Sequence, residues 1–281
     1  MLPTVWALLP AVCVQVWWYG VPVLATVFTV IVLCYALECV VALVRKQALG
    51  GAVSDGSTLV TALLLGLAVT PNCSPWQLGL GAVFAIVVAK HCYGGLGRNV
   101  FNPAMVGYAA VLISFPGTMA VWPDPLMVDG MSSATPLADA RIVARGGPSS
   151  PLTDAWIWIN AAYALGGAWL LWRRMIPLAL PLAVIAGVVI GSVGFATASL
   201  ETTMAHLFAG ATFACAFFIA TDPVSAVREP WSRWPYGLLI GLIIVVIREH
   251  GSYPDGVAFA VLLANALAPL MDRLVTKVRY E

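Results

Sequence analysis

The chain has 281 residues, of which 61% are hydrophobic and 10% are charged, and its net charge is +1. A soluble domain carries about 25% charged residues, so this composition excludes an ordinary soluble protein and indicates a polytopic membrane protein. The small net charge gives no electrostatic reason to expect nucleic acid as a partner. The six cysteines are scattered without a CxxC pair, so they indicate neither a disulfide framework nor a metal site.

Ten apolar segments follow one another, and we expect about ten transmembrane helices in an all-α fold. The first has no basic n-region or cleavage site, so we expect a spanning helix rather than a signal peptide. Several segments are shorter than the ~20 residues of a straight span, and short segments that begin at Gly- or Pro-containing turns favour broken helices around a site near the midplane. The alternative is an error of a few residues in the boundaries. The segments cover roughly residues 4–18, 21–43, 57–70, 76–90, 103–115, 154–172, 177–194, 206–221, 236–248 and 254–270.

The distribution of the 14 Lys and Arg residues predicts the orientation. If both termini are cytoplasmic, inner loops hold all of them, Lys90 included, except Arg141, Arg145 and Arg248. Positive charge favours the cytoplasmic side. The long polar loop 116–152 is therefore expected on the outer side, which in a bacterium is the periplasm.

A weak internal repeat divides the chain into residues 1–115 and 153–281, joined by the loop 116–152. Val87–Lys90 matches Val245–Arg248, and Thr61 with the following Thr-Pro matches Thr212 with the following Asp-Pro. Five helices in each copy would invert the second copy in the membrane. The competing explanation is chance similarity between apolar segments.

A few ionisable side chains inside or beside apolar segments need a reason, because such groups are costly in a membrane. Glu38 either pairs locally or snorkels, or it contributes to an ion path. His206 is expected at the outer interface. Asp55, Asp222 and Asp255 lie in turns rich in Gly, Ser or Pro, where Asp caps its own backbone, and the alternative is a ligand site at the ends of broken helices.

The Gly-rich basic stretch 90–99 is expected to form a tight re-entrant turn. A phosphate-binding nest is the alternative, although the stretch matches neither a P-loop nor a dinucleotide fingerprint.

The loop 116–152 contains one threonine with small neighbours, Thr135, in the sequence Asp129-Gly-Met-Ser-Ser-Ala-Thr-Pro-Leu137. A loop of this length in a compact protein is usually functional or disordered. The residue types alone predict only a surface loop, a turn or a modification site.

Five stretches in order resemble the D subunit of the Rnf electron-transport complex, which is homologous to the B subunit of the sodium-pumping NADH:quinone reductase. The resemblance covers essentially the whole chain. The stretches are Ser54–Thr61, Tyr93–Met105, Asp129–Leu137, Phe218–Ala226 and Tyr253–Ala260.

The resemblance implies two inverted five-helix halves and a flavoprotein. Members of this family attach FMN by a phosphoester to the last residue of a Ser/Thr-Gly-Ala-Thr motif, which falls on Thr135, with Ala134 before it and Ser133 at the glycine position. Asp129 and Gly130 belong to the same attachment stretch. A second, non-covalent riboflavin is also implied, and the residues predicted for its site are Asp55, Gly56, Asn102 and Asp222.

The implied function is that of an electron-carrying subunit in a redox-driven ion translocase of the ferredoxin:NAD oxidoreductase type, not catalytic alone. The implied partners are the A, B, C, E and G subunits, above all the flavin-bearing G subunit, together with the lipid bilayer and a flavin transferase during maturation. The implied location is the bacterial inner membrane. A small-solute channel or transporter with inverted repeats is the alternative, and a structural scaffold is a third possibility. Trp122, Trp156 and Trp158 flank the loop and either anchor it at the interface or stack on the flavin.

Overall fold

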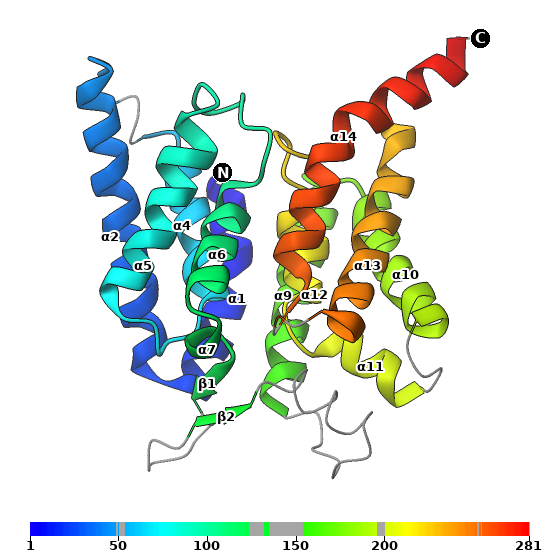
Figure 1. The fold of residues 1–281 in the computed structure, drawn as a ribbon, viewed down its shortest axis with the longest axis horizontal. Helices are drawn as coiled ribbons and strands as arrows, with labels where there is room; N and C mark the ends of the chain where they lie inside the picture. Colours follow the sequence, from blue (N-terminus) through cyan, green and yellow to red (C-terminus); the bar gives the residue numbers. More distant parts are fainter. Residues whose placement is uncertain are drawn as a thin grey trace. The chain divides into compact units, whose positions relative to one another are not determined.

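The computed structural model describes residues 1–48, 50, 54–123, 132–134, 154–195, 200–251, 253 and 255–280 of the chain. The described elements are helices apart from one two-stranded sheet of three-residue strands. The chain forms two compact units, Met1–Ser133 and Ala134–Glu281. In Figure 1 the first unit runs from blue to green and the second from green to red.

The first unit is a helical bundle whose elements coincide with the first five predicted segments. The fourth segment is continuous but changes from α-helix to π-helix at Phe84. A short helix and a strand follow the fifth segment. The elements are α1 (Leu2–Tyr19), α2 (Val21–Val44), α4 (Ser57–Ala68), α5 (Pro75–Val83), η1 (Phe84–His91), α6 (Pro103–Ser114), α7 (Pro116–Met119) and β1 (Val121–Pro123).

The second unit contains helices at the other five predicted segments. The strand β2 (Ser132–Ala134) precedes them at the boundary between the units. The helices are α9 (Asp154–Trp172), α10 (Ala179–Phe195), α11 (Leu200–Phe208), α12 (Thr212–Ala214), η2 (Cys215–Ile219), η3 (Pro230–Ser232), α13 (Arg233–His250) and α14 (Val257–Tyr280).

The expectation of an all-α polytopic membrane protein is confirmed. Among the described residues, four helices are long and apolar enough to cross a membrane, and a bent pair makes a fifth if it counts as one span. The two segments predicted to be short, 57–70 and 103–115, form helices of 12 residues each. The four helices are Leu2–Tyr19, Val21–Val44, Pro230–His250 and Val257–Lys277.

The eighth predicted segment, 206–221, does not form a single helix. Helix α11 already begins at Leu200 and ends at Phe208, and the chain bends by 60° before Thr212–Ile219. Gly210 lies at φ +76° in this bend, a conformation that glycine adopts at little cost. The apolar run hides this break because its residues stay hydrophobic on both sides of the glycine.

Close contacts between helices depend on glycine in both units. In the first, a Cβ on Gly107 of α6 would lie 2.5 Å from the carbonyl oxygen of Gly81 in α5. In the second, a Cβ on Gly187 of α10 would lie 2.5 Å from the carbonyl oxygen of Leu238 in α13. Small residues that let helix backbones approach closely are typical of membrane bundles.

The strands β1 and β2 pair with each other, and β1 is tied to the helices of the first unit. The hydroxyl of Thr70, which follows α4, donates to the carbonyl oxygen of Val121 at 2.9 Å, and the Asn72 side-chain amide donates to the same oxygen at 3.3 Å. Figure 1 shows the two strands together, next to α7. The chain on either side of residues 124–131 is therefore anchored to the bundle.

Candidate functional site

The predicted flavin-attachment stretch falls only partly within the described residues. Thr135, Asp129 and Gly130 lie outside them, whereas Ser133 and Ala134 belong to strand β2. Because β2 pairs with β1, the backbone directly before Thr135 is held in an extended conformation.

The tryptophans that flank the attachment loop lie in different surroundings. Trp122 in β1 is 9% exposed and its ring lies 5.4 Å from that of Tyr19, centroid to centroid. Trp158 on α9 is 59% exposed. Trp122 is therefore a packing residue, while Trp158 suits a membrane interface.

Asp55 and Gly56, both predicted for an inner flavin site, form the turn that starts α4. One Asp55 carboxylate oxygen accepts hydrogen bonds from the Ser57 amide at 2.7 Å and the Ser57 hydroxyl at 2.8 Å. Gly56 lies at φ +72° in the left-handed region. This is the turn geometry that Asp and Gly favour.

Asn102 and Asp222 also contact their own local backbone. Asn102 is buried, and its side-chain oxygen accepts from the Met105 amide at 3.2 Å at the start of α6. Asp222 accepts from the Val224 amide at 3.1 Å and from the Ser225 hydroxyl at 2.8 Å. Burial raises the pKa of the Asp222 carboxyl, although these two hydrogen bonds act in the opposite direction. These local hydrogen bonds support the interpretation of the residues as turn and capping residues, and the inner flavin site stays a prediction.

A buried polar cluster in the first unit was not predicted as such. We call it the Lys90 cluster, and it consists of Glu38, Ser57, Thr58, Lys90 and His91. The Lys90 ammonium donates to the Glu38 carboxylate at 3.0 Å, to the Ser57 hydroxyl at 2.9 Å and to the Thr58 hydroxyl at 3.1 Å. The side chains of Lys90 and Glu38 are 3% and 2% exposed. All three ammonium protons therefore have acceptors away from water.

The Glu38 carboxylate is shared within this cluster. It accepts from the Thr58 hydroxyl at 3.1 Å, and its other oxygen lies 3.0 Å from His91 Nε2. Arg45 lies beside the cluster, and its guanidinium donates to the His91 carbonyl oxygen at 2.6 Å. Glu38 thus pairs with residues far along the chain rather than with its neighbours on α2, and α2, α4 and η1 meet at this carboxylate.

The second unit contains a comparable set, the Arg248 cluster, which consists of His206, Thr212, Arg248, Glu249 and Asp255. Arg248 is 2% exposed and donates from Nε to Asp255 at 3.0 Å, with Nη2 2.9 Å from the same carboxylate oxygen. Its Nη1 donates to the His206 carbonyl oxygen at 2.6 Å and to the Thr212 hydroxyl at 3.0 Å. His206 Nε2 lies 2.9 Å from Glu249. The guanidinium therefore bridges the bend between α11 and α12.

The two clusters share one arrangement. In each, a buried cation near the end of one helix donates to a threonine at the start of another helix, and that second helix follows a turn or a break in the chain. Lys90 contacts Thr58, and Arg248 contacts Thr212. The repeat in the sequence already matched Lys90 with Arg248, but it matched Thr212 with Thr61, one helical turn after Thr58. A charge at the end of each apolar run was the signal that could have revealed both clusters.

The placement of Lys90 and Arg248 in loops was wrong. Lys90 belongs to η1 and Arg248 to α13, and each is buried. Both remain inside because each has a carboxylate and a threonine hydroxyl as acceptors, which offset the loss of water. Arg233, Arg273 and Lys277, which were also counted with the inner loops, belong to α13 and α14.

The stretch 90–99 forms a tight turn, as expected. Gly94, Gly95 and Gly97 have φ between +83° and +108°, and the amides of Gly94 and Gly95 donate to the carbonyl oxygens of His91 and Lys90 at 3.0 Å each. These two amides close the end of η1, so they do not contribute to a phosphate-binding nest.

The chain matches known proteins along its whole length. A model of the NQR2, RnfD, RnfE family matches residues 1–281. The chain is 38% identical to the D subunit of the ion-translocating oxidoreductase complex of Actinobacillus succinogenes, over 97% of this chain and 90% of that protein. It is 40% identical to the protein of the same name from Yersinia enterocolitica and 37% identical to that from Escherichia coli, each over 97% of this chain and 91% of the relative. With the helical bundle and the five matching stretches, these similarities place the chain in the NQR2, RnfD, RnfE family.

Proposed function

We propose that this protein is the electron-carrying D subunit of an ion-translocating oxidoreductase complex, with FMN attached to Thr135 on the periplasmic side of the bacterial inner membrane. The observation that carries the proposal is the match over 97% of the chain to relatives that are named as the D subunit of such a complex. These names do not favour the alternative of a small-solute channel.

The anchored strand before Thr135 suits a covalent attachment point. Ser133 and Ala134 belong to β2, which pairs with β1, and β1 is bonded to Thr70 after α4. A phosphoester between the Thr135 hydroxyl oxygen and the ribityl phosphate would fix one end of the flavin close to this anchor. The tether would replace diffusion by a high effective concentration.

The protein and the cofactor would divide the task. When bound, FMN supplies one- and two-electron transfer, whereas the protein supplies attachment, orientation and tuning of the potential. The bias of Lys and Arg toward one set of loops supports a periplasmic position for Thr135, with both termini in the cytoplasm. The implied partners are the other subunits of the complex, above all the flavin-bearing G subunit, and a flavin transferase would form the phosphoester.

Flavin fluorescence of the denatured protein in a gel tests this proposal. The full chain would be produced with a flavin transferase as wild type, Thr135→Ala and the control Ser132→Ala, which removes a nearby hydroxyl. We expect fluorescence from wild type and from Ser132→Ala, and none from Thr135→Ala. Equal fluorescence from all three proteins would refute attachment at Thr135.

A further inference from the structure

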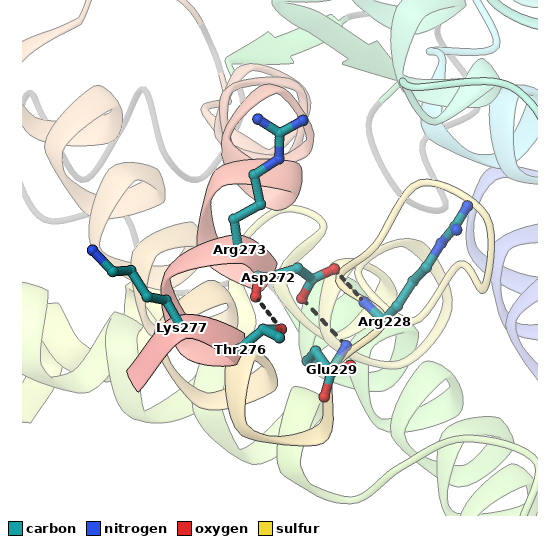
Figure 2. A pocket seen from close by; sticks show the side chains of 6 residues that line it. All are labelled: Arg228, Glu229, Asp272, Arg273, Thr276 and Lys277. Carbon is teal, nitrogen blue, oxygen red and sulfur yellow. Dashed lines mark hydrogen bonds between the residues drawn. The ribbon is translucent and has the colours of Figure 1, made fainter. Parts of the chain in front are cut away.

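A shallow cavity lies in the second unit, and none of its lining residues belongs to the Arg248 cluster. It has a volume of about 470 Å³ and is lined by six residues. Figure 2 shows them around the Asp272 carboxylate, with the ends of Arg228, Arg273 and Lys277 directed away from it. The six residues are Arg228, Glu229, Asp272, Arg273, Thr276 and Lys277.

One of the two acidic side chains that line this cavity, Asp272, is bonded to the backbone. The Asp272 carboxylate accepts from the backbone amides of Arg228 at 2.9 Å and Glu229 at 3.2 Å. These bonds fix the segment before η3 against α14. In the part of the chain that the structure describes, the exposed guanidinium groups of Arg228 and Arg273 have no carboxylate within ion-pair distance. The cavity is therefore lined by three cationic and two acidic side chains, and the carboxylate of one of the acidic residues, Asp272, is bonded to the backbone.

The cavity lies at the ends of two candidate membrane spans. The span Pro230–His250 begins directly after Arg228 and Glu229, and the span Val257–Lys277 ends at the cavity. Helix η3 packs against both α13 and α14. Trp231 and Trp234, which are 69% and 45% exposed, mark the start of the first of these spans, as tryptophan does at membrane interfaces.

Exposed apolar side chains lie beside the cavity residues on α14. Leu270 and Leu274 on α14 are 53% and 55% exposed, and they lie within one helical turn of Arg273. A molecule that contacts both surfaces needs an anionic head and a hydrocarbon tail. A phospholipid with a net negative headgroup has both, and basic pockets between helices at the cytoplasmic interface are suited to such headgroups.

We propose that this cavity binds the phosphate of an anionic phospholipid, with Arg228 and Arg273 as its cationic ligands. Arginine suits phosphate because its planar guanidinium donates two parallel hydrogen bonds. The acyl chains would lie along Leu270 and Leu274. This proposal is independent of the flavin at Thr135.

The test is native mass spectrometry of the detergent-purified full chain, titrated with phosphatidylglycerol or phosphatidylcholine. The variant is Arg228→Gln/Arg273→Gln. The matched control is Arg173→Gln/Arg174→Gln, which removes two exposed arginines that follow α9. At about 1 kcal/mol per cation near an anionic surface, the variant is expected to lose about thirtyfold in phosphatidylglycerol affinity. The phosphatidylglycerol affinity of the control variant is expected to change by less than about threefold, which corresponds to about 0.5 kcal/mol.

Two outcomes would overturn the proposal. They are an unchanged phosphatidylglycerol affinity in the cavity variant and an equal loss in the control variant. Arg273→Glu alone serves as a second variant if the double variant does not fold, and it is expected to bind phosphatidylglycerol more weakly than wild type. Equal binding of phosphatidylcholine and phosphatidylglycerol by wild type would also contradict a site for anionic lipid.

Discussion

The Lys90 cluster and the Arg248 cluster each stabilise a buried cation, but with different partners. Lys90 takes its carboxylate from Glu38 on another helix, whereas Arg248 takes its carboxylate from Asp255 in the turn that follows its own helix. Lys90 donates to side chains, whereas Arg248 also donates to the His206 carbonyl oxygen. The pairing of Lys90 with Glu38 joins different helices, whereas the contacts of Arg248 stabilise the bend between α11 and α12. We therefore expect the carboxylate to contribute more to the stability of the fold in the first unit.

The largest effect is expected from Glu38→Gln. This change leaves the buried Lys90 ammonium without its counter-charge, and loss of one partner of a buried pair costs about 3–5 kcal/mol. The free energy of unfolding of the purified chain would be measured with denaturant. Glu201→Gln, on an exposed glutamate of α11, is the matched control, and an equally small change in both variants would contradict the importance of the pair.

Removing both charges of the pair is expected to be milder than removing one. The cost of Glu38→Gln comes from a buried charge without a partner, so Glu38→Gln/Lys90→Met, which removes that charge as well, should recover much of the free energy lost in Glu38→Gln. A double-mutant cycle would measure this coupling. Additive losses would show that Glu38 and Lys90 act independently.

Asp255→Asn is expected to have an intermediate effect. Arg248 keeps the His206 carbonyl oxygen and the Thr212 hydroxyl, and the asparagine oxygen can still accept from the Gly256 amide, which lies 2.7 Å from Asp255. Loss of hydrogen bonds to a charged group suggests about 1.5–3 kcal/mol. A loss as large as that of Glu38→Gln, in the same unfolding measurement, would remove the proposed difference between the clusters.

The smallest effects are expected from Thr58→Val and Thr212→Val, and they should resemble each other. Each hydroxyl accepts from the buried cation and donates to a neighbouring oxygen, that of Glu38 or that of the His206 carbonyl. Each change should cost about 1–3 kcal/mol. The control is Thr29→Val, which removes a hydroxyl that is bonded to a carbonyl of its own helix. If only one of the two threonine variants lost stability, the two clusters would not be equivalent.

Sequence patterns predicted the helices well because membrane spans depend on long apolar runs. The short helices at 57–70 and 103–115 followed from their Gly- and Pro-containing starts. The bend near Gly210 did not, because hydropathy is insensitive to backbone direction. The repeat linked Lys90 with Arg248 although it missed their burial.

The site was predictable to a smaller extent. Asp55 and Asp222 were expected either as turn residues or as ligands, and their local hydrogen bonds support the first interpretation. The charge of Lys90 at the end of an apolar run could indicate a buried cation, but Glu38 is far away in the chain, so no local pattern could indicate it as the partner. Thr135 was predicted as the attachment residue only through the resemblance to a family motif, since a threonine among small residues has no distinctive chemistry of its own, and this stays a prediction.

The position of the flavin is the central claim, and peptide mass spectrometry tests it most directly. The protein would be purified from the assembled complex, digested, and the peptide containing Thr135 sequenced by fragmentation. The account predicts one flavin phosphoester on Thr135, with Ser132 and Ser133 unmodified. An unmodified Thr135, or a flavin on another residue of this chain, would contradict it.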